Sequence, residues 1–152
     1  MCLLQQLPIP EKYLTKKQTF IGWKIVYKES NTKWSGEFYN NEREFSFNRW
    51  IASDSYPIYT DRHSSCYLSG FHIFTKQEDA IAWLSNKPCE TIEWVRYKVV
   101  QVRFRQVTAF GQQMDVKNCL DCVVAQQLLV IKPEVNWIDR PRTVRAHISD
   151  DY

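Results

Sequence analysis

Glycine, histidine and long apolar runs are all scarce in this chain, which has four glycines and three histidines among 152 residues. Few glycines argue against a glycine-rich phosphate loop and against low-complexity content. No apolar run approaches the length of about 18 residues that a membrane helix needs. The opening MCLLQQLPIP has neither a basic region nor a long apolar core, so we expect no signal peptide or membrane anchor. These absences predict a soluble, cytoplasmic protein with no membrane partner.

The charge excess is also small, at +3. Dedicated nucleic-acid binders concentrate many more basic residues, so any basic site should be local. The cysteines number five, which is odd, and no export signal accompanies them. We therefore expect reduced thiols and no disulfide framework.

Apolar and aromatic residues are plentiful, at 44% and 14%, with six tryptophans. A chain of this length and composition can bury a core as one domain. Pro8 and Pro10 predict an extended N-terminal arm over 1–18, before a domain over 19–132. The stretch 133–152, with Pro133, Pro141, three arginines and a closing Asp150-Asp151, predicts a C-terminal tail.

Four segments predict strands, because β-branched and aromatic residues dominate them: 20–28, 33–39, 90–107 and 123–132. The first two flank a turn and predict a hairpin. In the third, the alternation of apolar residues changes phase between Val99 and Val100, which predicts a bulge or bend. The fold class is therefore α+β: one domain, mainly antiparallel sheet with one or two packed helices.

The clearest local pattern is a strand–turn–helix unit over 66–86. Thr75 and Glu78 have the spacing of a capping box, which predicts a helix over 76–85. Ala80, Trp83 and Leu84 would share its apolar face.

The stretch 54–65 is rich in loop-forming residues, and loops of this length often carry function. Arg62 and His63 lie in it, and His63 is the better candidate for a general base or an anion contact. His72 lies within a predicted strand, where a hydrogen-bonded core imidazole is more common than a catalytic one. Tyr67 lies close to it in sequence.

Basic residues recur along the longest predicted strand, at Arg96, Lys98, Arg103 and Arg105. They can line a groove for phosphate or acidic protein, or they can form the ordinary solvated face of a strand. Nearby aromatics have the chemistry to stack bases, but the same side chains would also suit a core. The candidate ligand-binding residues are Arg62, His63, Tyr67, His72, Arg96, Lys98, Arg103 and Arg105.

Two readings of the cysteines stay open beside ordinary buried thiols. Cys119 and Cys122 can hold half of a tetrahedral zinc site, with Cys66 and Cys89 as the other ligands. Cys2, if exposed by removal of Met1, would be an N-terminal thiol nucleophile. We assign no metal ligand.

Several of these stretches resemble a set of small uncharacterised bacterial and phage proteins: an initial Met-Cys, the strand 23–28, Ser69-Gly70-Phe71-His72-Ile73-Phe74 leading into a helix, and the strands 99–104 and 124–130. This resemblance implies a bacterial or mobile-element origin.

The middle of the chain is also similar to ADP-ribosyltransferase-like domains, in which such segments frame a pocket for NAD. The matching positions are Lys24 or Tyr27, Tyr67, His72, and Gln126 or Gln127. A glutamine stands where that family has an acidic residue.

The predicted function is binding of a host protein or a small nucleotide or nucleic-acid ligand through a basic, aromatic-rich surface, with no cofactor. An NAD-using enzyme and a zinc-stabilised module are the alternatives.

Overall fold

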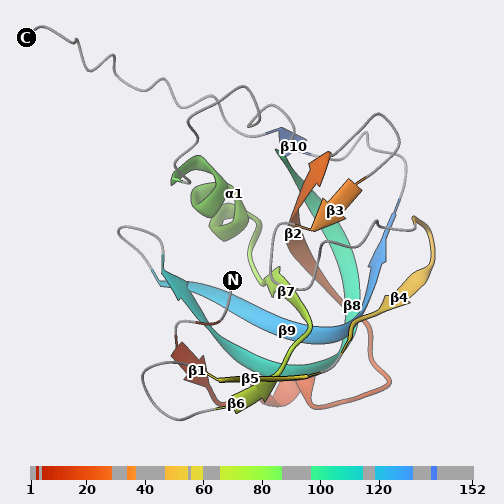
Figure 1. Cartoon of the computed structure of the whole chain (residues 1–152), viewed down its shortest axis with the longest axis vertical. Coiled ribbons are helices and arrows are strands. Elements are labelled where there is room, and N and C mark those ends of the chain that lie inside the picture. The colour runs from red at the N-terminus through yellow and green to blue at the C-terminus, as the bar shows by residue number, and fades with distance from the viewer. Residues whose placement is uncertain are drawn as a thin grey trace, which may run out of the picture.

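The computed structural model describes residues 3, 5–28, 34–36, 47–54, 56–59, 66–86, 97–114, 119–131 and 138–139. Antiparallel strands dominate this part of the chain, and one α-helix packs on them (Figure 1). The elements in chain order are β1 (Gln5–Leu7), the 3-10 helix η1 (Glu11–Tyr13), β2 (Phe20–Lys28), β3 (Trp34–Gly36), β4 (Trp50–Ala52), β5 (Pro57–Tyr59), β6 (Cys66–Leu68), β7 (Phe71–Phe74), α1 (Gln77–Asn86), β8 (Tyr97–Met114), β9 (Cys119–Val130) and β10 (Ile138–Asp139). The mainly antiparallel sheet is confirmed. The helical share is small, with α1 as the α-helix of the described residues.

Two long strands, β8 and β9, organise the sheet. β8 pairs with β2 through its first half and with β9 through its second half. β9 pairs with β7, and β7 returns to β2 through the pair Trp23–Phe74. The strands β2, β8, β9 and β7 therefore form a closed cycle of pairings, whose curvature is visible in Figure 1.

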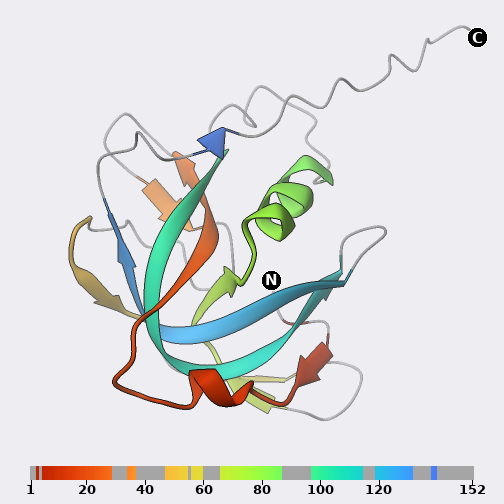
Figure 2. The same ribbon diagram turned by 180° about the vertical axis from the view of Figure 1, so that it is seen from behind.

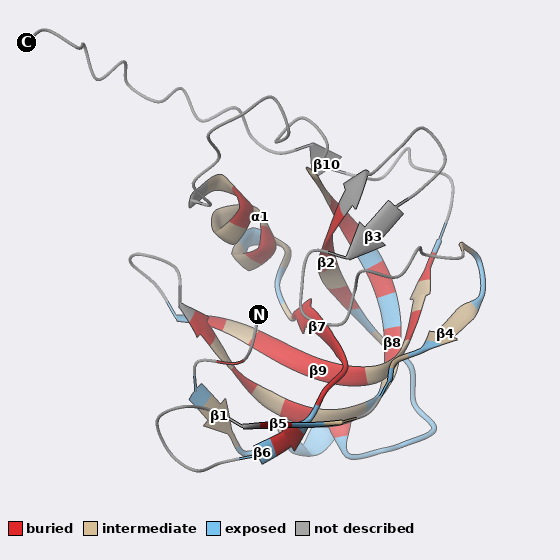
Figure 3. Ribbon diagram, in the orientation of Figure 1, coloured by how far each residue is buried: buried red, intermediate tan, exposed pale blue. Residues whose placement is uncertain are grey.

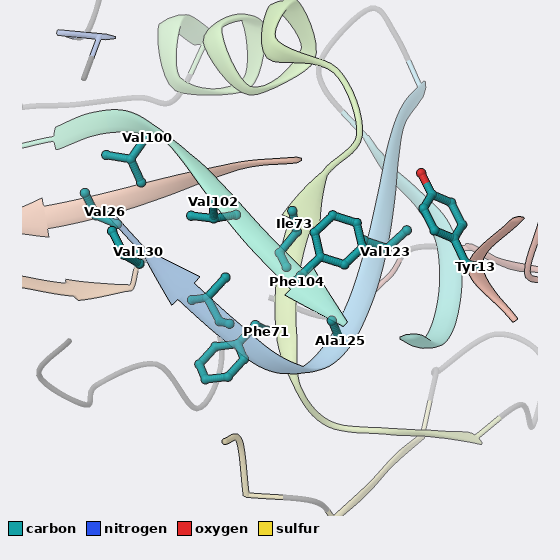
Figure 4. Close-up of a cluster of buried hydrophobic side chains, with 11 residues drawn as sticks. Tyr13, Val26, Phe71, Ile73, Val100, Val102, Phe104, Val123, Ala125 and Val130 are labelled. Atoms are coloured by element: carbon teal, nitrogen blue, oxygen red, sulfur yellow. The ribbon is translucent and has the colours of Figure 1, made fainter. Parts of the chain in front are cut away.

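The inner face of this cycle carries the main core. Alternate residues of β8 (Val100, Val102 and Phe104) point into it, because successive side chains of a strand point to opposite faces. Val26 from β2 and Ile73 from β7 join them. Figure 4 shows these side chains in one cluster with Val123 and Ala125 of β9.

One end of the outer face of the same strands is covered by α1. Ala80 and Leu84 are fully buried against Ile25, Phe74 and Val99. Trp83 packs at the margin of this cluster, so the predicted apolar face of the helix is confirmed. In Figure 3 the buried side of α1 lies toward the sheet.

Burial on both faces explains the phase change predicted as a bulge. Val99 faces α1 and Val100 faces the inner core, and both are buried. The β2–β8 register runs without interruption through this point. The register shift lies further along, between Val107 and Ala109, next to Gln106 with φ 60°. The location of the predicted bulge was therefore wrong.

The N-terminal segment predicted as an arm is part of the sheet. β1 pairs with β8 opposite Phe110, Gly111 and Gln112. Tyr13 in η1 is buried, with its ring 4.9 Å from that of Phe20. In Figure 2 this segment runs beneath β8. The two prolines follow the end of β1 and do not prevent it from pairing with the sheet.

Three further boundaries differ from the sequence prediction. The predicted loop 54–65 includes β5, which pairs with β6. The stretch 108–121, which contains Gly111 and many polar residues and lies between the predicted strands 90–107 and 123–132, is strand as far as Met114 and again from Cys119. In the predicted tail 133–152, β10 pairs with β8. Polar side chains misled the second assignment, because a strand that pairs on both edges tolerates glutamine and glycine.

Candidate functional site

The structure separates the predicted site residues into different regions. Arg62, His63 and Arg96 lie outside the described residues. Tyr67 and His72 are buried, at 4% and 1% exposure. The remaining three, Lys98, Arg103 and Arg105, lie on β8.

Tyr67 and His72 form a buried hydrogen-bonded pair. The Tyr67 hydroxyl lies 3.2 Å from His72 Nε2, and the same oxygen accepts a 2.8 Å hydrogen bond from the Leu3 amide. The phenol proton is thus placed to donate to an unprotonated Nε2. Burial, with the Lys24 charge as the second cause, lowers the pKa of His72 to about 3, against an opposing hydrogen bond with the Gly70 backbone. His72 is therefore a neutral imidazole at neutral pH.

Lys24 is fully buried, although a charged residue between the apolar Trp23 and Ile25 is the kind expected on the solvent face of a half-buried strand. It follows Gly22 and precedes Val26 on the inner face. Its Nζ donates a 3.1 Å hydrogen bond to the His72 carbonyl and lies 5.9 Å from the centre of the Phe71 ring. Burial lowers the pKa of Lys24 to about 7.

This polar cluster is a packed part of the interior. Tyr67 shares a hydrophobic cluster with Leu3 and Val124, on the outer face of β7 and β9. Tyr67 and His72 are therefore buried beneath the N-terminal segment. They do not share a surface with Arg103, whose side chain is exposed. Through the Tyr67 hydroxyl, Leu3 is linked to His72 of β7, and Tyr67 and His72 have little contact with solvent.

The basic residues of β8 do not share one face. Lys98 and Arg103 are five positions apart in an unbroken register, so their side chains point to opposite faces. Arg103 and Arg105 are two positions apart and point the same way. The continuous stripe inferred from the sequence is thus reduced to these two arginines within the described residues.

Arg103 belongs to a row of four paired residues on the outer face. Ile21 pairs with Arg103, Arg103 with Leu129, and Leu129 with Trp50. The row crosses β2, β8, β9 and β4, a width of about 14 Å for four strands. Ile21 is 54% exposed and Arg103 is exposed. α1 covers the other end of this face, over Ile25.

Arg105 and Gln127 form the next pair along the same face. The Arg105 guanidinium carbon lies 4.1 Å from the centre of the Trp50 ring, and its Nε donates to the Gln127 side-chain carbonyl. Two contacts thus hold the guanidinium in place. We call this surface the arginine face: Ile21, Trp50, Arg103, Arg105, Gln127 and Leu129.

Acidic side chains are almost absent from the four strands of the arginine face. Among the described residues of β2, β4, β8 and β9, Asp121 is the acidic one. It pairs with Gln112, toward the far end of the β8–β9 hairpin. The arginine face is therefore locally positive, although the whole chain carries only +3.

The cysteines of the zinc alternative, Cys119 and Cys122, do not lie side by side. Cys119 and Cys122 are three positions apart in β9, so they point to opposite faces, and one is exposed while the other is buried. Burial raises the pKa of Cys122 to about 12. Cys66 is exposed on β6, while Cys2 and Cys89 lie outside the described residues.

Gln126, which the resemblance places where the ADP-ribosyltransferase-like domains have an acidic residue, is held by hydrogen bonds to neighbouring segments. Its amide nitrogen donates to the Ser69 carbonyl at 2.8 Å and to Thr108 Oγ1 at 3.0 Å. Its carbonyl accepts from Ser53 Oγ at 2.9 Å. Lys24, Tyr67 and His72 of that resemblance are buried, and Gln127 is half-buried and bonded to Arg105.

The sequence analysis missed Trp50, Ile21 and Leu129 as partners of the arginines. Trp50 lay in a region of mixed periodicity, and strand pairing across the sheet is not readable from one chain segment. One signal was available: the odd numbers of Arg103 and Arg105 separate them from Lys98 in any regular strand.

Comparisons of the chain with models of protein families, with curated proteins and with solved structures found no match. The described residues contain no helix with the length and apolar character needed to cross a membrane.

Proposed function

We propose that this protein is a binding protein that holds an anionic partner on the arginine face. The observation that carries the proposal is the pairing of Arg103 and Arg105 with Trp50 on one partly exposed sheet face whose strands are nearly free of acidic residues.

The geometry of Arg105 supports this function. Stacking on Trp50 and the bond to Gln127 restrict the guanidinium before any partner arrives. A planar guanidinium held in this way loses less side-chain entropy when it binds a phosphate or carboxylate. Arg103, exposed two positions away, supplies a second positive charge at a distance of about 7 Å along the strand.

The resemblance to bacterial and phage proteins would make the partner a host macromolecule. The ADP-ribosyltransferase-like alternative rests on resemblance alone. Incubation with labelled NAD and candidate acceptors tests it separately, and transfer or hydrolysis of NAD would support it.

The experiment that tests the binding function compares two double variants of equal charge. Arg103→Ala with Arg105→Ala removes two charges from the arginine face, whereas Lys76→Ala with Lys98→Ala removes two charges elsewhere. Fluorescence anisotropy is measured against three labelled polyanions: a heparin fragment, polyglutamate and single-stranded oligothymidylate.

We expect at least one polyanion to bind. The arginine double variant should weaken its binding by about tenfold or more, at roughly 1–3 kcal/mol per lost contact, and the lysine double variant by much less. Equal losses in the two variants, or no binding of any polyanion, would overturn the proposal.

A further inference from the structure

We infer that the anionic partner of the arginine face is a single-stranded nucleic acid, an inference that rests on the proposed function and narrows it. Its bases would stack on the planar and apolar members of the face, while its phosphates would meet Arg103 and Arg105. Three observations on the molecule carry the inference.

The first observation is the chemistry of the row that crosses the sheet. One basic side chain stands among apolar and aromatic ones along it, in the order Ile21, Arg103, Leu129 and Trp50. Beside it, the Arg105 guanidinium is stacked on the Trp50 indole. Nucleobases stack on aromatic rings and on guanidinium planes, and this stacking is largely independent of base identity.

The second observation is the shape of the surface. The arginine face is part of a sheet about 14 Å wide across four strands, and the helix α1 lies over its other end. A helix or a two-stranded ribbon is the usual element inserted into the major groove of a duplex. Sheet surfaces with aromatic and basic side chains instead hold unpaired strands, whose bases are free to lie flat on them.

The third observation is the inventory of hydrogen-bonding groups. Arg103 and Arg105 supply donors alone, and Asp121 lies away from them at the other end of the hairpin. A phosphate backbone repeats its acceptors along its length and therefore suits two arginines on one strand. An acidic protein would satisfy the charges but would leave the planar surfaces without a stacking partner.

The test uses the full chain and labelled probes of about twelve nucleotides: single-stranded oligothymidylate and oligouridylate, a duplex of the same length, and polyglutamate. Anisotropy is measured across a range of salt concentrations. We expect both single strands to bind more tightly than the duplex and than polyglutamate.

Variants of the arginine face separate its two kinds of contact. Arg103→Ala with Arg105→Ala should lower the slope of log affinity against log salt by about 1.4, since each neutralised phosphate of a single strand contributes about 0.7. Trp50→Ala should weaken binding by about tenfold, or about 1.4 kcal/mol, because a stacking contact is lost, and should leave the salt slope unchanged. Arg105→Lys keeps the charge and loses the planar stack, so it should resemble Trp50→Ala. Circular dichroism checks that each variant is folded.

Three results would overturn the inference in distinguishable ways. Tighter binding of the duplex or of polyglutamate would refute a single-stranded partner and leave the proposed anion-binding function standing. Failure of every polyanion to bind would refute both. Unchanged salt slopes in the arginine double variant would refute the role of the arginine face even if an oligonucleotide binds.

Discussion

Lys24 shows how far a single side chain can depart from what its strand pattern predicts. Its place between Trp23 and Ile25 predicts the polar side of a half-buried strand. Around Lys24, however, hydrophobic clusters cover both faces of β2. The ammonium group reaches the His72 carbonyl, next to the point where β2 and β7 make their single pair. A buried charge of this kind is costly, and the low pKa of Lys24 reflects that cost.

Replacement of Lys24 by methionine should therefore change the pH dependence of stability. The pKa of Lys24 is about 7 when folded and 10.5 in the unfolded reference. Between these values the unfolded chain binds more protons, so this lysine makes stability rise with pH from about 7 to 10, by at most about 1.4 kcal/mol per pH unit. Lys24→Met should lack this rise. Its stability relative to the wild type should therefore be greater at pH 7 than at pH 10. Urea unfolding at a series of pH values measures the difference.

Lys76→Met is the matched control, since Lys76 is exposed on the turn before α1. Its pH profile should follow that of the wild type. A wild-type profile parallel to that of Lys24→Met between pH 7 and 10 would contradict the assignment of the buried charge.

Gln126 gives a second prediction for a single residue. Gln126→Glu restores the carboxylate of the resembled family, but it removes the donor to Ser69 and Thr108 and places a negative charge beside a carbonyl oxygen. We expect a loss of about 1–3 kcal/mol in the free energy of unfolding, because buried acceptors lose their partners. Chemical denaturation measures it. Gln101→Glu, at an exposed site on β8, should change stability by well under 1 kcal/mol. A Gln126→Glu protein as stable as that control would contradict the structural role of Gln126.

Individual strands and the helix were largely predictable, because their signals are local. β2 has the predicted bounds, β3 pairs with it as the predicted hairpin partner, and α1 begins and ends one residue after the prediction. The alternation of β8 was harder to read. Alternation of apolar and polar residues shows which faces of a strand are buried, and it does not show the backbone geometry. Burial of both Val99 and Val100 therefore gave the same pattern as a bulge.

The true irregularity of β8 leads to a prediction about that strand. Gln106 adopts φ 60°, a left-handed conformation that costs roughly 1 kcal/mol or more for a residue with a Cβ. Gln106→Gly should therefore be neutral or slightly stabilising, whereas Gln106→Val should destabilise by more than 1 kcal/mol, because a β-branched residue tolerates this conformation poorly. Thermal unfolding compares the two. Equal stability of the glycine and valine variants would show that the strand is regular at this point.

The candidate site was less predictable than the elements, for a physical reason. The arginine face exists because four strands from distant parts of the chain pair in register, and no local pattern encodes that register. The sequence shows Arg103 and Arg105 as basic strand residues. Trp50 reaches Arg105 only because its strand β4 pairs with β9, and no local pattern predicts that pairing. Tyr67 and His72 were candidate ligand-binding residues in the sequence, yet the tertiary fold buries them beneath Leu3.

For the molecule as a whole, the closed cycle of β2, β8, β9 and β7 makes the two faces of the sheet interdependent. The inner face holds the main core, and the outer face carries α1 at one end and the arginine face at the other. Gly22 lies where the cycle closes. A Cβ at this position would lie 2.5 Å from Ile73 Cγ2 and 2.9 Å from Phe104 Cε1.

Gly22→Ala should therefore destabilise the whole domain, by about 1–3 kcal/mol for an overpacked core. Because the pairings form a cycle, strain at Gly22 is shared by all four strands, and hydrogen exchange should accelerate in β2, β7, β8 and β9 together. Gly111→Ala is the contrasting variant: its Cβ would collide with the Gln5 carbonyl, so accelerated exchange should centre on β1. Faster exchange confined to β2 in Gly22→Ala would mean that the strands of the cycle open independently of one another.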